Sequence, residues 1–313
     1  MGRIIVYTFS GILLILVLSI YLSLYAAPQS AGSTTASFTG VVADEQGKVI
    51  TNASVTVRNL QTNITRQLYT DSTGTFLFTQ LLPGYHEIIV QADGFATQTT
   101  RLELLLGSTI VFNFTMQVGR VDNIVEVNTS TLINLGKTES STNIDRQRID
   151  DLPINRRNFL DFALTAPRVT LDRLPPFGST ATSGLSFNGQ TARNNNITID
   201  GVTNNDNFSG GVRTTFSQDA VQEFQIVSDN YSAEFGRASG GIINIVTRSG
   251  SNNLRGNLFC FIRNDELSAR EVFTTNRPPY DQYQFGATLS GPIKKDRAFF
   301  FASFERLSIN QNI

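Results

Sequence analysis

Few side chains in this sequence could do covalent or metal chemistry. His86 and Cys260 are the sole histidine and cysteine among 313 residues. Catalytic zinc sites usually take about two or three histidine ligands, and a Ser-His-Asp triad would need His86 without the Gly-x-Ser-x-Gly elbow of such serines. A single cysteine forms no disulfide within the chain. We therefore predict a protein that is not an enzyme and takes no metal or cofactor, with His86 at the surface or at a strand end.

A denser group of oxygen donors lies at Asn204, Asn205, Asp206 and Asn207. Calcium prefers carboxylate and amide oxygens, but the Asp-x-Asp-x-Asp-Gly spacing with a closing glutamate is missing. The group follows shortly after an Asp-Gly pair, 200–201, which is typical of a turn after a strand. We interpret the segment as a polar loop and not as a metal site.

The composition favours β structure that binds no nucleic acid. The net charge is −1, so no broad basic surface is available for a phosphate backbone. Charged residues make up 16% of the chain, against roughly 25% in ordinary soluble domains. Glycine (24) and phenylalanine (23) are plentiful, which suits turn-rich strands better than helices.

The N-terminus begins with a long apolar segment. Residues 4–25 are almost all apolar, and small and polar residues follow at 26–33. A secretory signal and an uncleaved membrane anchor both fit this pattern. We assign residues 1–27 to one of these, favouring a cleaved signal, and expect the remainder to leave the cytoplasm.

Residues 38–117 predict a compact β domain. Val55 and Val57 alternate with polar neighbours, which is the two-residue period of a half-buried strand. Turn signals at 71–74, 82–84 and 93–94 divide the region into about seven short strands, the pattern of an antiparallel sandwich. These turns resemble those of the carboxypeptidase regulatory-like domain. The resemblance implies a prealbumin-like β-sandwich, grouped with carbohydrate-binding-like folds, that serves as a spacer or docking module.

The region 118–149 is polar and is predicted to be a linker. One short exception, Val121–Val127, is extended, β-branched and acidic. Taken alone it fits either the last strand of the preceding domain or its exit linker.

The most specific motifs lie at 150–250. Asp151-Leu-Pro-Ile-Asn-Arg-Arg-Asn-Phe159 opens the region, Phe187-Asn-Gly-Gln190 begins a run that ends in a strand and an Asp-Gly turn, and Glu223–Val227 and Ile242–Thr247 flank a glycine-rich turn. In this order they resemble the plug domain of TonB-dependent outer-membrane receptors, in particular the Oar-like branch. Arg156 stands where that branch usually has glycine. The resemblance implies an α+β plug.

Residues 251–313 alternate as outer-membrane barrel strands do. Leu258, Cys260 and Ile262 belong to one apolar face, and later runs repeat the pattern at 282–290 and 298–305. A long polar connection at 265–281 and a short one at 291–296 match the loops and turns of such barrels. Three strands cannot close a barrel, and plugged receptors have about 22. We therefore expect an incomplete transmembrane β-barrel, with Ile313 not a natural boundary.

The receptor resemblance also implies sites and partners. A TonB box ahead of the plug would bind the energy-coupling protein TonB by strand addition, and the candidate is Asp122, Asn123, Ile124, Val125, Glu126 and Val127. The substrate-facing plug loop would contain Asn204, Asn205, Asp206, Asn207 and Arg213. Arg213, and Asp219 with Glu223, are expected in plug–barrel salt bridges and not in an acid–base pair. The implied partners are TonB, outer-membrane lipid and an unidentified extracellular substrate. The sandwich and one side of the plug would then face the periplasm.

Two other functions fit the same sequence. A surface adhesion or polymer-export protein could use this architecture without active import, and binding of 122–127 to TonB would separate it from a receptor. A secreted carbohydrate-binding module could use 38–117 alone. The absence of tryptophan weakens that reading, because aromatic rings are the usual stacking surface for sugars.

Overall fold

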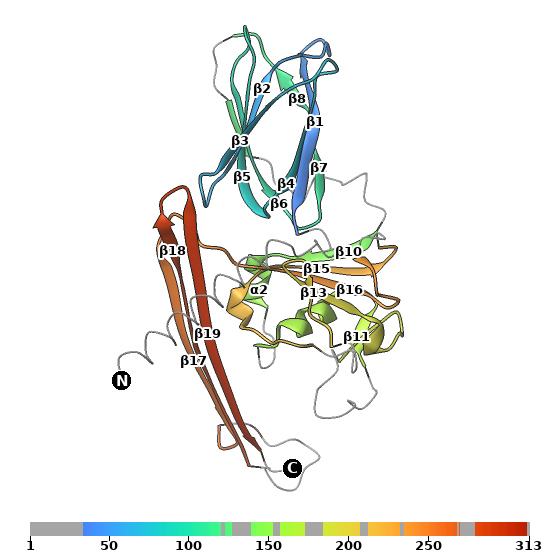
Figure 1. The fold of residues 1–313 in the computed structure, drawn as a ribbon, viewed down its shortest axis with the longest axis vertical. Coiled ribbons are helices and arrows are strands. Elements are labelled where there is room, and N and C mark those ends of the chain that lie inside the picture. Colours follow the sequence, from blue (N-terminus) through green and yellow to red (C-terminus); the bar gives the residue numbers. More distant parts are fainter. Residues whose placement is uncertain are drawn as a thin grey trace, which may run out of the picture.

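The computed structural model describes residues 34–119, 123–126, 139–152, 157–172, 184–206, 212–231, 235–267, 269 and 279–311 (Figure 1). A β-sandwich, a mixed sheet with short helices and a set of long antiparallel strands follow one another along the chain. The predicted signal or anchor at 1–27 lies outside the described residues. No helix in the described ranges is long and apolar enough to cross a membrane.

Two sheets form the sandwich. One has the order β4-β1-β7, with β8 also paired to β1, and the other has the order β3-β2-β5-β6-β9. The strands are β1 (Ala36–Asp44), β2 (Ser54–Asn59), β3 (Thr65–Tyr69), β4 (Thr75–Leu81), β5 (Gly84–Gln91), β6 (Gln98–Leu104), β7 (Thr109–Val111), β8 (Phe114–Met116) and β9 (Asn123–Glu126).

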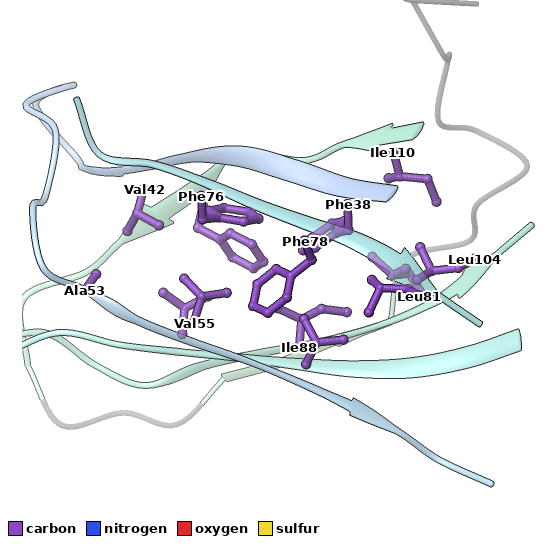
Figure 2. Close-up of a cluster of buried hydrophobic side chains, with 14 of the residues drawn as sticks. Phe38, Val42, Ala53, Val55, Phe76, Phe78, Leu81, Ile88, Leu104 and Ile110 are labelled. Carbon is purple, nitrogen blue, oxygen red and sulfur yellow. The ribbon is translucent and has the colours of Figure 1, made fainter. Parts of the chain in front are cut away.

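Alternating apolar residues fill the space between these sheets. Phe38, Phe78 and Phe114 are at most 1% exposed, and Phe76 is buried beside them. Figure 2 shows Phe38, Phe76 and Phe78 between the two sheets, opposite Val55 of the facing sheet. Burying each such ring contributes roughly 1.5–3 kcal/mol. The two-residue alternation read from the sequence therefore corresponds to the core of the domain.

The end of the sandwich, at 109–116, is not one continuous strand. Two short strands, β7 and β8, each pair in parallel with β1. Between them the side chain of Asn113 accepts a hydrogen bond from the Val41 N–H at 2.9 Å. That side-chain bond replaces a backbone bond to β1 at this point, so the strand is interrupted.

The predicted linker also contains two strands. β9 pairs in parallel with β6 and so belongs to the sandwich, while β10 (Ser140–Ile144) pairs antiparallel with a strand of the plug. The sequence of β10, Ser-Ser-Thr-Asn-Ile, has no apolar alternation, so nothing in its pattern marks it as a strand. The plug sheet therefore begins before residue 150.

The plug is a five-stranded mixed sheet with the order β10-β15-β16-β13-β14. β13 and β16 are parallel, and the other neighbours are antiparallel. A separate hairpin of β11 and β12 and short helices accompany the sheet. The elements are α2 (Arg146–Asp151), η3 (Phe159–Thr165), β11 (Val169–Leu171), β12 (Leu185–Phe187), η4 (Ala192–Asn194), β13 (Asn196–Ile199), β14 (Val202–Thr203), η5 (Gln218–Ala220), β15 (Val221–Asp229) and β16 (Ile242–Thr247).

Apolar residues of β15 and η3 pack together in the plug core. Phe224 and Ile226 of β15 and Phe159 and Phe162 of η3 are at most 2% exposed. The segment Phe159–Thr165 forms the 3₁₀ helix η3. It begins where the Asn158 side chain accepts a hydrogen bond from the Leu160 N–H at 3.2 Å, the usual role of an N-cap asparagine.

Three long antiparallel strands follow the plug: β17 (Arg255–Asn264), β18 (Tyr280–Lys294) and β19 (Ala298–Gln311). They form a long ribbon beside the plug (Figure 1). β18 continues through Pro292, which the sequence places in a turn, and the register shifts between Pro292 and Lys294. Proline cannot donate to a ladder and is tolerated at such a bulge, so the turn itself shortens to 295–297.

Candidate functional site

The candidate TonB box is an edge strand. Four of its residues, Asn123–Glu126, form β9, which pairs with β6 from Gln98↔Asn123 to Arg101↔Glu126. Asp122 and Val127 lie outside the described residues. β9 is last in its sheet, and no strand of the described part of the chain pairs with its other edge. That edge carries backbone donors and acceptors of the kind a partner strand requires.

The candidate substrate loop is held at its base by two asparagines. The buried Asn204 side chain donates to the Thr214 carbonyl at 2.9 Å and accepts from the Thr214 N–H at 3.1 Å. The Asn205 side chain accepts from the Ile197 N–H at 2.7 Å and donates to the Asn195 carbonyl at 3.0 Å. Both amides are therefore engaged with the backbone of the plug.

The remaining predicted loop residues differ in exposure. Arg213 is exposed, and its backbone N–H donates to the Asn204 carbonyl at 2.9 Å. Asp206 is half-buried, and Asn207 lies outside the described residues. Of the described loop residues, Arg213 presents the charged side chain that is open to solvent.

The Asp219 carboxylate forms ion pairs with two arginines inside the plug. This buried carboxylate lies 2.8 Å from an Arg157 guanidinium nitrogen and 3.4 Å from one of Arg146. The prediction that Asp219 makes a plug–barrel salt bridge is therefore wrong, because both partners belong to the plug. The contact with the barrel is made by Arg157, the partner of Asp219. Its guanidinium lies 4.4 Å from the Phe259 ring centroid and 5.3 Å from that of Phe261.

The contacts of Arg157 with two rings of β17 identify the face of this strand that is turned toward the plug. Phe259 and Phe261 point to the plug, while Leu258 on the other face is 83% exposed. Tyr283 and Phe285 of β18 are likewise exposed, opposite buried Gln282 and Gln284. The predicted alternation of the barrel strands is thus confirmed: one face is apolar and open, and the other meets the plug.

Polar side chains join the plug to the inner face of the strands. Glu305 of β19 accepts hydrogen bonds from the Ser217 hydroxyl of the plug and from the Gln284 amide of β18. These residues line an open cavity of about 710 Å³, together with Arg157 and Phe304. Hydrogen bonds of this kind can be replaced by hydrogen bonds to water, whereas the contacts of an apolar core cannot.

Glu223 does not face the barrel as predicted. It lies on β15 and is 3% exposed, and both its carboxylate oxygens accept from the N–H of Leu106 in the sandwich, each at 3.0 Å. Burial raises the pKa of Glu223 to about 8. The hydrogen bonds from Asn143 and Leu106 have the opposite effect and lower this pKa, but burial outweighs them. The nearby carboxylates of Glu103 and Asp145 raise it further. Glu223 belongs to the joint between sandwich and plug.

His86 and Cys260, the two residues that could take part in catalytic or redox chemistry, do not belong to the candidate sites described above. His86 is 2% exposed and so is not at the surface, but it lies near the start of β5, as the strand-end alternative predicted. Its Nδ1 lies 2.9 Å from the Gly84 carbonyl. Burial lowers its pKa. Cys260 is exposed on β17. Within the described ranges, no three His, Cys, Asp or Glu side chains lie close enough to hold a metal ion.

The contact between the sandwich and the plug was not predicted from the sequence. Glu223 and Gln225 are polar residues on one face of a strand whose other face is core, and this pattern alone signals a polar partner. The partner, Leu106, is 117 residues away in the chain, and only its backbone takes part. No side-chain pattern marks a backbone amide as a partner.

Three regions of the chain match known families, in chain order. Residues 37–117 match the Carboxypeptidase regulatory-like domain, residues 135–242 the TonB-dependent Receptor Plug Domain, and residues 246–313 the Outer membrane beta barrel domain. Over 297 residues, or 90% of this chain, the sequence is 31% identical to the TonB-dependent transporter Oar of Myxococcus xanthus. The chain spans about a quarter (27%) of the length of that relative.

Solved structures align only in part. The siderophore receptor PirA from Acinetobacter baumannii aligns with 53% of this chain and 24% of its own, at 20% identity and a TM-score of 0.41. A catechol 1,2-dioxygenase from Acinetobacter radioresistens aligns with 29% of this chain and 58% of its own, at 14% identity and a TM-score of 0.24. Both TM-scores are below 0.5, so neither alignment bears on function.

The predicted resemblance, the mainly β fold and the outer-membrane location are confirmed by these matches. The curated relative is a transporter, in keeping with a chain that is not an enzyme. The chain therefore contains a carboxypeptidase regulatory-like domain, a TonB-dependent receptor plug domain and outer-membrane barrel strands in this order, and it is similar along 90% of its length to the TonB-dependent transporter Oar.

Proposed function

We propose that this chain is the N-terminal part of a TonB-dependent outer-membrane receptor that takes up a substrate through a barrel gated by the plug. One observation carries the proposal: a short strand with an open edge, β9, lies ahead of a plug that contacts the inner face of barrel strands. The function is transport and not catalysis. The wider division of the chain is proposed as a signal or anchor at 1–27, a sandwich at 38–117 that β9 joins, a plug that starts with β10 and runs to 250, and barrel strands at 251–313.

TonB acts at β9 in this proposal. An extended segment of TonB would add to the open edge of Asn123–Glu126 as the next strand of the sheet, with main-chain hydrogen bonds giving affinity. Because backbone groups make the contact, the affinity for TonB depends less on which side chains β9 carries than on whether its outer edge is unpaired. In this proposal the sandwich and the turn at 295–297 lie on the periplasmic side, and the opposite strand ends, at Asn264 and Asp281, lie on the outer side.

The substrate binds on the outer side, where the loop around Arg213 provides a charged contact. Asn204 and Asn205 shape this loop through their bonds to Thr214, Ile197 and Asn195. Binding moves the plug, and the Ser217–Glu305 contact is exchanged for water as the path opens.

Replacing Val125 with proline tests the coupling step. Proline has no backbone N–H and interrupts strand pairing, so we expect the affinity of the complete receptor for the periplasmic domain of TonB to fall at least about tenfold. The control Val125→Thr keeps the N–H and the β-branched side chain, and its affinity should stay within about twofold of the unmodified receptor, since main-chain bonds dominate. Equal binding by both variants, measured by titration in detergent, contradicts a TonB box at this position.

A further inference from the structure

The sandwich is joined to the plug by the turn after β6. The N–H of Leu106 donates to both oxygens of Glu223 at 3.0 Å, and its carbonyl accepts from Asn143 at 2.9 Å and from Gln225 at 3.1 Å. Leu106 is fully buried. Three polar side chains of β10 and β15 therefore bind both the backbone N–H and the backbone carbonyl of one residue in another domain.

The plug side of this joint is rigid. Asn143 and Gln225 are direct partners across the β10–β15 ladder, and Glu223 lies two residues from Gln225 on the same face. Glu223 also accepts from the Asn143 side chain at 2.7 Å. The opposite face of β15 carries Phe224, which packs in the plug core. A displacement of the turn is thus passed directly to a strand of the plug sheet.

The turn fits because Gly107 follows Leu106. Gly107 has φ +65°, and a Cβ added there would collide with the side-chain amide of Gln225. An added carbon is accommodated only if that amide moves away from the Leu106 carbonyl. By contrast, Gly94 of the same domain has φ +86° with no atom within 4 Å of an added Cβ.

The sandwich touches the barrel strands at a second point. The side chain of Asn63, in the loop after β2, donates to the Asp296 carboxylate at 3.1 Å in the turn between β18 and β19. Asn252, ahead of β17, donates to the same oxygen at 2.9 Å, and its N–H donates to the Gln61 carbonyl at 3.1 Å. Figure 1 shows the lower end of the sandwich beside both the plug sheet and this end of the ribbon.

We propose that the sandwich is a two-point clamp between plug and barrel. One end is the 105–108 turn held by Asn143, Glu223 and Gln225, and the other is the 61–63 loop held by Asn252 and Asp296. While both ends are engaged, the plug cannot shift against the first barrel strands without breaking hydrogen bonds to the sandwich. The clamp is a property of the described contacts and stands whether or not β9 binds TonB.

Hydrogen–deuterium exchange of the complete receptor in detergent tests the clamp. In the unmodified receptor, the Leu106 amide should exchange at least about tenfold more slowly than the exposed Gly94 turn, because it donates to a buried carboxylate. Gly107→Val should raise exchange at 105–108 and in β10 at least about tenfold. The matched control Gly94→Val carries the same positive φ without a plug contact and should leave both unchanged.

Two further variants keep the test decisive if Gly107→Val does not fold. Gln225→Ala removes a donor to Leu106 from the plug side, and it should raise exchange at 105–108 while β4 stays protected. Asn63→Gly releases the barrel end and should raise exchange of the Asn252 amide, with 105–108 still protected. Rapid exchange of Leu106 in the unmodified receptor, or unchanged exchange in Gly107→Val and Gln225→Ala, contradicts the clamp.

Discussion

Asp219→Ala is expected to destabilise the plug by about 3 kcal/mol, because it leaves a largely buried arginine without its carboxylate. Arg157 lies 2.8 Å from Asp219 and has a side chain only 19% exposed, so water cannot replace the lost charge fully. Arg146 keeps Asp150, four residues along α2, and is less affected. The measurement is the free energy of opening of β15, taken from amide exchange in the complete receptor.

The matched control is Asp229→Ala. Asp229 also pairs with an arginine, Arg168, at 2.9 Å, but both side chains are more than half exposed. Surface pairs of this kind contribute at most about 1 kcal/mol. Similar losses for the two substitutions would contradict the expectation that the buried pair contributes more to stability than the exposed pair.

The second large effect is on pH dependence. Glu223 holds its proton in the folded protein up to about pH 8, because burial raises its pKa, whereas its ordinary value is 4.5. Between pH 4.5 and 8 the folded state therefore binds a proton that the unfolded state has released, and stability falls as pH rises. The loss over this window is on the order of a few kcal/mol, at about 1.4 kcal/mol per pKa unit.

Glu223→Gln should flatten this profile, since the amide is neutral at every pH. Burial, and then Asp145, also raise the pKa of Glu103, so a smaller slope of the same sign remains. Glu103 in turn raises the pKa of Tyr85. The check is exchange protection of Leu106 at pH values from 5 to 8.5 after correction for intrinsic rates. Stability that rises toward pH 8, or equal slopes in both proteins, contradicts a protonated Glu223.

Much of the fold could be predicted because alternation reports burial directly. Val55 and Val57 in the sandwich, Phe224 and Ile226 in the plug, and Leu258 on β17 all lie on the faces that their spacing predicts. Barrel strands are read in the same way, because one apolar face must meet lipid. These features depend on neighbours within a few residues.

What the sequence did not reveal depends on distant partners. β10 is a strand only because β15 offers it an edge, and its Ser-Ser-Thr run carries no apolar period. The joint at Leu106 uses backbone atoms whose position is set by two folded domains. Glu223, expected to face the barrel, faces the sandwich instead, because the bulge between Val221 and Glu223 and the strand register fix its direction.

The clamp and the proposed TonB site are adjacent in one sheet. β9 pairs with β6, and β6 ends two residues before Leu106. A pull on β9 would therefore reach the plug through β6 and the 105–108 turn as well as through the covalent chain. This consequence depends on the proposed function, whereas the two contacts of the clamp do not.

Cysteine cross-linking in whole cells tests the central claim, that this receptor is coupled to TonB through β9. Val125→Cys, in a Cys260→Ser background free of other cysteines, is paired with a single cysteine in the periplasmic domain of TonB. We expect a cross-linked product for Val125→Cys and none for Tyr69→Cys, which lies on the edge strand β3 at the opposite end of the same sheet. No product at position 125, or equal products at both positions, would contradict the claim.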